Sequence, residues 1–134
     1  MDKVSVIPLL QVGGVSFGCS RDSVRKAFGQ YKEYRKGSIS KNTSDDFGFC
    51  HVYYDKENRC EAIEFFSGCK VEVDDTIVFP GDVDKAIKKL GDFEQKCDCF
   101  INLRQSIGIT ASDGKMESIL FGKKDYYKQL MSKG

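Results

Sequence analysis

The residues best suited to catalysis are few and poorly placed for it. The single histidine, His51, directly follows Cys50. A nucleophilic cysteine needs a base within hydrogen-bonding reach. The segment around these two residues is rich in aromatic and β-branched residues, which are typical of strands. Adjacent residues of a strand point to opposite faces, so Cys50 and His51 would not face each other. Gly13 and Gly14 alone match no phosphate-binding motif. We therefore predict that the protein is not an enzyme.

A zinc site would have to draw on cysteines and the one histidine. The candidate ligands are Cys60, Cys69, Cys97, Cys99 and His51. Structural zinc sites usually pair cysteines separated by two to four residues, whereas a single residue separates Cys97 from Cys99. We predict no metal and no other cofactor. A sensor that binds a small molecule or a metal through its cysteines is an alternative that stoichiometric zinc in the purified protein would support.

Acidic and aromatic side chains concentrate in one stretch, residues 45–66. Alternate strand residues face opposite ways, so the aromatic rings cannot all enter one core. They are either exposed or covered by the polar segment 31–46 and the C-terminal tyrosines. Exposed rings rimmed by acids are typical of protein-binding surfaces, where the acids steer a basic partner and the rings supply affinity. The predicted partner contacts are Asp45, Asp46, Tyr53, Tyr54, Glu61, Glu64 and Phe66.

The composition fits one small domain spanning residues 1–134. Lys and Arg number 21 against 20 Asp and Glu, so the basic excess of a nucleic-acid-binding protein is missing. No apolar run approaches the ~18 residues of a membrane span, and the acid at position 2 and Pro8 make the N-terminus a poor signal peptide. We expect a cytoplasmic protein in which most of the six cysteines are free thiols.

Capping residues and apolar spacing predict two helices. Ser20 can cap a helix that ends at Gly29, and the segment 80–82 opens a second helix that ends at Gly91. Residues 31–46 are predicted to form a loop or an irregular edge segment. Strands are predicted over 4–10, 47–54, 59–66, 69–73, 76–79, 99–103, 107–111 and 116–121, and a short C-terminal helix over 125–131.

The two halves of the chain share a short pattern, glutamate, small residue, isoleucine, any residue, phenylalanine. It occurs at residues 61–65 and again at 117–121, each time after a helix and a hairpin turn. This pattern predicts pseudo-repeats over about 14–66 and 76–122. Two such helix-plus-hairpin units side by side would form an α+β fold, in which one antiparallel sheet carries the helices on one face as a two-layer sandwich.

The first helix carries a resemblance to known domains. The segment from Gly18 to Gly29 (GCSRDSVRKAFG) resembles the helix signature of β-lactamase-inhibitory-protein-like domains, which also occur in small outer-membrane assembly lipoproteins. That signature has methionine and leucine where this chain has Cys19 and Phe28, which are apolar exchanges. The resemblance implies the tandem-repeat fold of those domains.

A longer resemblance covers most of the chain. Residues 46–66 and 108–121, together with Tyr126 and Tyr127, are similar to a family of small bacterial proteins that includes immunity proteins of polymorphic or contact-dependent toxin systems. This implies a stoichiometric inhibitor that binds a cognate toxin domain, often a nuclease, and it brings no catalytic residues. The alternative is a structural or assembly module of the same fold that forms a homodimer or binds a scaffold.

Overall fold

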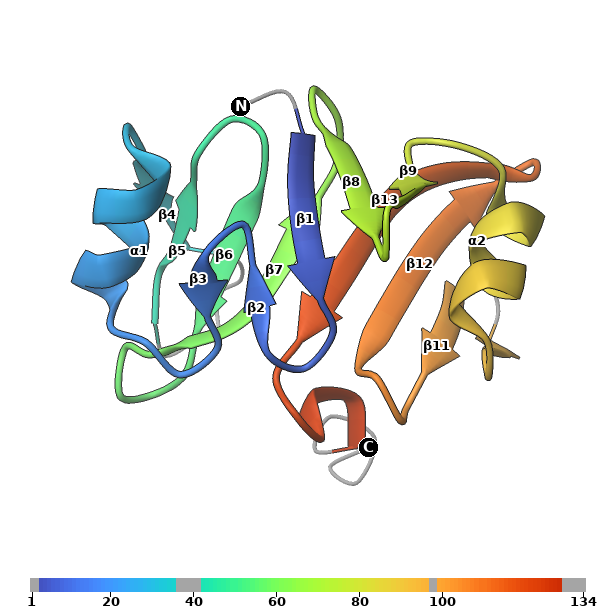
Figure 1. Cartoon of the computed structure of the whole chain (residues 1–134). Helices are drawn as coiled ribbons and strands as arrows, with labels where there is room; N and C mark the ends of the chain where they lie inside the picture. The colour runs from blue at the N-terminus through green and yellow to red at the C-terminus, as the bar shows by residue number, and fades with distance from the viewer. Residues whose placement is uncertain (1–2, 36–41, 97–98, 129–134) are drawn as a thin grey trace.

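The computed structural model describes residues 3–35, 42–96 and 99–128. It is an α+β fold, mostly β, in which the described residues form two sheets, the helices α1 (Arg21–Phe28) and α2 (Val83–Leu90), and a short helical segment at 126–128 (Figure 1). The five-stranded sheet has the order β3 (Val15–Ser16), β2 (Gln11–Val12), β1 (Lys3–Ile7), β8 (Lys70–Val73) and β9 (Thr76–Phe79). The eight-stranded sheet has the order β10 (Glu94–Lys96), β11 (Cys99–Asn102), β12 (Ile107–Ser112), β13 (Lys115–Gly122), β7 (Cys60–Phe65), β6 (His51–Tyr54), β5 (Ser44–Asp46) and β4 (Lys32–Tyr34).

The prediction of a single antiparallel sheet needs correction. A second sheet packs against one face of the eight-stranded sheet, between the two helices (Figure 1). The helices cover the rest of that face. The second sheet forms because β1 lies between the hairpins β2–β3 and β8–β9 and pairs in parallel with β8, with Val4 opposite Val71. β1 is thus a central strand. Its pairing joins segments far apart in the sequence, which local patterns do not reveal.

Both helices begin and end where the capping residues predict. The Ser20 hydroxyl accepts a hydrogen bond from the Ser23 amide, and the Asp82 carboxylate accepts one from the Asp84 amide. Gly29 and Gly91 end the helices with φ of 92° and 75°, a conformation that glycine adopts without a steric penalty. The capping predictions are confirmed because they depend on chemistry within a few residues.

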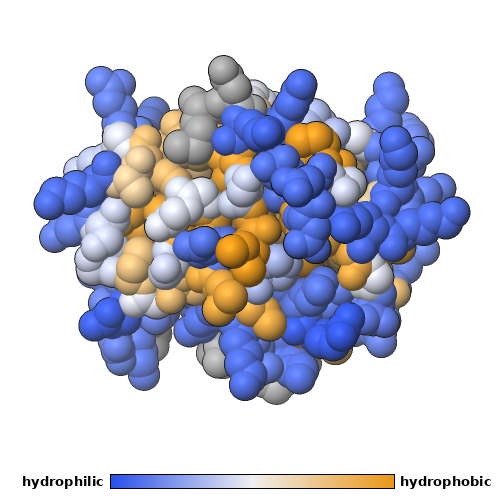
Figure 2. Space-filling model, in the orientation of Figure 1, coloured by the Kyte–Doolittle hydropathy of each residue, from blue (hydrophilic) through white to orange (hydrophobic). Residues whose placement is uncertain are grey.

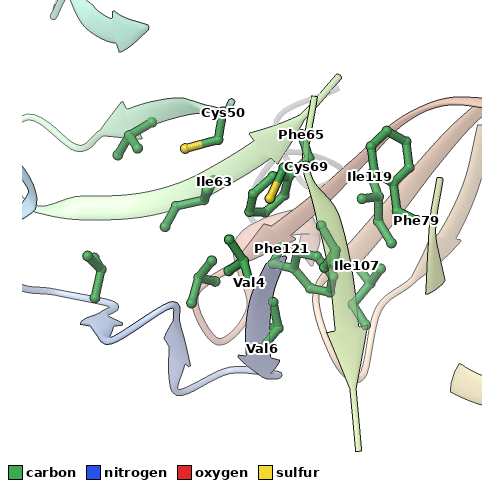
Figure 3. Packing of buried hydrophobic residues seen from close by; sticks show 14 of the residues in the cluster. Val4, Val6, Cys50, Ile63, Phe65, Cys69, Phe79, Ile107, Ile119 and Phe121 are labelled. Atoms are coloured by element: carbon green, nitrogen blue, oxygen red, sulfur yellow. The ribbon is translucent and has the colours of Figure 1, made fainter. Parts of the chain in front are cut away.

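The hydrophobic core lies between the two sheets. Side chains from β1, β7, β9, β12 and β13 converge there (Figure 3). Cys50, Cys60 and Cys69 are buried among them as small apolar residues. In the described parts of the chain five cysteines are free thiols, and Cys97 lies outside the described residues.

The strands that carry the shared pattern are neighbours at the centre of the eight-stranded sheet. β7 and β13 pair antiparallel, with Ile63 opposite Phe121 and Phe65 opposite Ile119. All four of these side chains are fully buried. Four strands lie on each side of the boundary between β7 and β13, each set following one helix in the sequence. The outermost strands, β4 and β10, are short and largely charged, which discourages pairing with another chain.

Several predicted boundaries shift. The strand predicted over 47–54 begins only at His51, and the polar segment 31–46 contains the hairpin of β4 and β5 at the sheet edge. The C-terminal helix is present at 126–128, while 129–131 lie outside the described residues. None of the described helices is long and apolar enough to cross a membrane.

Candidate functional site

The eight-stranded sheet has an outer face, turned away from the five-stranded sheet and the helices. The C-terminal tyrosines cover the centre of this face, because Tyr126 packs in a cluster with Tyr53, Ala62 and Leu120, and Tyr127 packs against the cluster. Gly108 and Gly122 lie beneath the two tyrosine rings, and a side chain at either position would collide with them. Glycine is therefore required at these positions because the tyrosine side chains approach the backbone closely, and not because the chain turns there.

The outer face also carries a chain of polar contacts that runs from β4 to β13, here called the His51 network. Asp46 Oδ2 lies 3.5 Å from His51 Nε2, and the Tyr34 hydroxyl lies 2.7 Å from His51 Nδ1. Tyr34 is also hydrogen bonded to Tyr53. Tyr53 donates to Glu64 Oε1 at 2.6 Å, and Ser118 donates to the other oxygen of Glu64 at 2.8 Å. The network thus joins five adjacent strands, β4, β5, β6, β7 and β13.

A pocket of about 260 Å³ opens beside this network. One wall is Phe66, which is 45% exposed and whose ring lies 4.8 Å from the His51 ring between centroids. The Asp46 side chain is 37% exposed at the pocket, and its Oδ1 accepts a hydrogen bond of 2.8 Å from the Gly48 amide. The lining residues are Asp46, Gly48, Phe49, Cys50, His51, Phe66 and Ser67.

Asp45 points the opposite way from Asp46 and is fully buried. Its carboxylate accepts hydrogen bonds from Arg25 at 2.8 and 2.9 Å, from Arg21 at 3.0 Å and from the Tyr54 hydroxyl at 2.8 Å. Burial alone would raise the pKa of Asp45, but the hydrogen bonds from Arg25, Arg21 and Tyr54 outweigh it and hold that pKa below its ordinary value. This carboxylate anchors α1 to β5.

Four of the seven predicted contact residues belong to the pocket or the network: Asp46, Tyr53, Glu64 and Phe66. Glu61 is half-buried elsewhere, 3.8 Å from Lys123. Asp45, Tyr53 and Tyr54 are buried in this structure. Asp45 enters the core side because it lies opposite the buried Val52 across the β5–β6 pair.

Sequence reasoning missed Tyr34, Ser118 and the two arginines that hold Asp45. Arg21 and Arg25 are four residues apart on α1, a spacing that places both on one helix face. That spacing is a readable signal for a shared acidic partner, although it does not say which acid. Tyr34 and Ser118 carry no such signal, since only the strand order brings them to His51 and Glu64.

A second exposed hydrophobic area lies on the opposite side of the molecule. Figure 2 shows hydrophobic residues over β1, β2 and the turn between them, surrounded by hydrophilic ones. Ile7 and Leu10 are its exposed members. This area lacks the pairing of an aromatic ring with a carboxylate that is present at Phe66.

We expect four tyrosines to resist ionisation in the folded protein. Burial, as the largest cause, raises the pKa of Tyr53, Tyr54, Tyr126 and Tyr127. A group whose folded pKa is raised stabilises the fold fully below its unfolded pKa of ~10, and this stability is lost as the pH rises further. An absorbance titration at alkaline pH should show these phenols ionising only together with the loss of circular dichroism. Smooth ionisation of all the tyrosines near pH ~10 with the fold intact would contradict their burial.

Comparison of the chain with protein-family models, curated proteins and solved structures found no match. Within the described residues, no three Cys, His, Asp or Glu side chains lie close enough together to hold a metal ion. The site offers a carboxylate and an exposed aromatic ring beside the His51 network.

Proposed function

We propose that the protein is an immunity protein, which binds a cognate bacterial toxin domain in a one-to-one complex and blocks it through the surface around Phe66. The observation that carries this proposal is the exposed Phe66 ring beside the Asp46 carboxylate, both set on the His51 network. An aromatic anchor held on a rigid sheet is typical of residues that dominate binding energy. The resemblance of the chain to toxin immunity proteins supports the same conclusion.

Binding is favoured over catalysis by the state of Tyr34. Its hydroxyl and His51 and Asp46 are arranged in the order nucleophile, base and acid. A nucleophile is activated by an adjacent base, by a lowered pKa or by a metal, and here burial, as the largest cause, raises the pKa of Tyr34, which disfavours its phenolate form. The hydroxyl is also hydrogen bonded to Tyr53. We therefore assign the trio a rigidifying role.

We also propose that the chain consists of two related repeats, in keeping with the tandem-repeat fold that the resemblance implies. The β7–β13 register supports this, since exchanging Ile63 with Ile119 and Phe65 with Phe121 reproduces the same pairs. Each half also ties its helix to its second strand with a buried polar residue. Asp45 does so through the arginines of α1, and Asn102 does so by donating to the Gly91 carbonyl at 2.6 Å.

The cytoplasm is the proposed compartment. Five described cysteines are free thiols, which suits a reducing environment. Cys50 and Cys60 sit in the core, where burial as the largest cause raises the thiol pKa and makes these groups poor nucleophiles. A cytoplasmic immunity protein would meet its toxin inside the cell that it protects.

The test is co-expression of the tagged protein with the open reading frames that flank its gene. We expect a one-to-one complex with a toxin domain, and restored growth of cells that express the toxin. Phe66→Ala should weaken the complex by about 30-fold or more, the effect of losing a dominant aromatic anchor. The matched control is Leu10→Ala on the opposite side, which is 64% exposed and should leave affinity unchanged.

Two outcomes would count against this proposal. A loss of affinity with Leu10→Ala but not with Phe66→Ala would move the binding surface to the five-stranded sheet. Recovery of the protein only as a homodimer, with no toxin partner, would favour the assembly module.

A further inference from the structure

We infer that the pocket beside His51 receives the side chain of an arginine from the bound partner. This inference rests on the proposed function, because it names the chemistry that the surface around Phe66 recognises. It predicts that the partner presents a basic segment to the outer face of the eight-stranded sheet.

The size of the pocket suits one side chain. At about 260 Å³ it falls below the range of about 300–1,000 Å³ that is usual for small-molecule sites. A metabolite would be poorly enclosed, whereas a single long side chain entering from a partner would fill it.

The groups around the pocket suit a planar cation. Asp46 lines the pocket, with Oδ1 held by the Gly48 amide and Oδ2 3.5 Å from His51 Nε2. The exposed Phe66 ring offers an aromatic face on which a guanidinium can stack. A carboxylate and an aromatic face together match the flat, forked geometry of arginine better than the compact charge of lysine.

The same protein already holds its own arginines in this way. Arg21 stacks on the Tyr54 ring at 4.3 Å and Arg25 on the Tyr31 ring at 3.9 Å, while both pair with the Asp45 carboxylate. Asp46 is the next residue of β5 and points to the opposite face. The inner face of β5 thus binds two internal arginines, and the outer face presents an equivalent carboxylate beside an exposed ring.

Two basic side chains neighbour Asp46. His51 Nε2 lies 3.5 Å from Asp46 Oδ2, and Lys32 is the cross-strand neighbour of Asp46 on the edge strand β4. Neither provides the bidentate hydrogen bonding of a guanidinium. An arriving arginine can therefore take over the contact that His51 makes with Asp46, and removal of the nearby Lys32 charge should strengthen its binding.

The test uses the isolated, isotope-labelled protein and an acetylated Gly-Arg-Gly amide peptide, followed by nuclear magnetic resonance. We expect the amide signals of Gly48, His51 and Ser67 to shift and saturate at millimolar peptide. The isosteric citrulline peptide, which lacks the charge, should bind about tenfold more weakly. Lys32→Ala should tighten binding about twofold, because it removes a nearby positive charge.

Matched variants show whether the pocket is the binding site. Asp46→Asn should weaken arginine binding about tenfold. Asp74→Asn, which removes one negative charge from a side chain that is 84% exposed, should not change it. Equal binding of the citrulline peptide, shifts away from the pocket, or no effect of Asp46→Asn would overturn the inference.

These outcomes are separable from those of the proposed function. Arginine binding in the pocket without any toxin complex in the co-expression experiment keeps the inference and removes the immunity function. A toxin complex that is sensitive to Phe66→Ala but unchanged by Asp46→Asn, together with no arginine binding, keeps the function and removes the inference.

Discussion

Asp45→Asn is expected to lower the free energy of unfolding by about 2–4 kcal/mol, somewhat less than the ~3–5 kcal/mol typical when one partner of a fully buried pair is removed. The substitution keeps the shape of the side chain but leaves Arg21 and Arg25 without their shared carboxylate. The loss of stability is reduced because the side chains of Arg21 and Arg25 are 13% and 21% exposed, so water partly solvates their charges. Arg25 also retains an ion pair with Glu33 at 3.2 Å.

Equilibrium unfolding in urea, followed by circular dichroism, measures this change. The control is Asp46→Asn, one residue away, which retains the oxygen that accepts from the Gly48 amide. It should change stability by no more than about 0.5 kcal/mol, as is usual for surface substitutions. Equal effects of the two substitutions would show that Asp45 does not anchor α1.

The pH dependence of the Asp45→Asn effect has a definite sign. The pKa of Asp45 is lowered in the folded state from an ordinary value of 3.8. Its contribution to stability is therefore complete above that value and disappears as the pH falls below it. The difference in stability between the wild type and Asp45→Asn should be constant from neutral pH down to about pH 5 and then shrink toward pH 2. A difference that stays constant down to pH 2 would contradict the lowered pKa.

Gly122→Ala is expected to destabilise the protein by about 1–3 kcal/mol, the usual cost of overpacking a well-filled site. A methyl group at this position would lie 2.7 Å from the Tyr126 Cβ and 2.8 Å from its ring. These atoms are close to the backbone, so a rotation of the side chain cannot remove the clash. The C-terminal segment must move away, and Tyr53, Ala62 and Leu120 then lose their cover.

Gly81→Ala is the matched control for this substitution. Nothing lies within 4 Å of a methyl group at Gly81, and its φ is outside the left-handed region. It should be neutral or slightly stabilising, because alanine restricts the unfolded chain. Thermal unfolding and amide hydrogen exchange of β13 measure both variants. If Gly122→Ala unfolded at the temperature of Gly81→Ala, the tyrosines would not be packed against the sheet as described.

Local chemistry determined the helices and the tight turns. Ser20 and Asp82 cap the two helices through amides within three residues of themselves. The turn at 74–75 and the turn at 113–114 join strands that the apolar pattern already marks. These features follow from the sequence because the interactions that create them connect residues close together in the chain.

The alternating pattern also determined which side of the central strands is buried. Ile63, Phe65, Ile119 and Phe121 all face the core. Alternation alone could not show that a second sheet covers them, because the pairing of β1 with β8 rests on backbone hydrogen bonds. Backbone groups are the same at nearly every residue, so local sequence carries little information on such partners.

The tertiary structure alone decided the roles of the adjacent acids Asp45 and Asp46. The sequence placed both at a binding surface, and the strand pairing turned Asp45 inward to the arginines of α1 and Asp46 outward to His51. A shift of one residue in the register would exchange the two roles. Which of the two acids is buried therefore depends on contacts between distant segments, and residue type alone does not determine it.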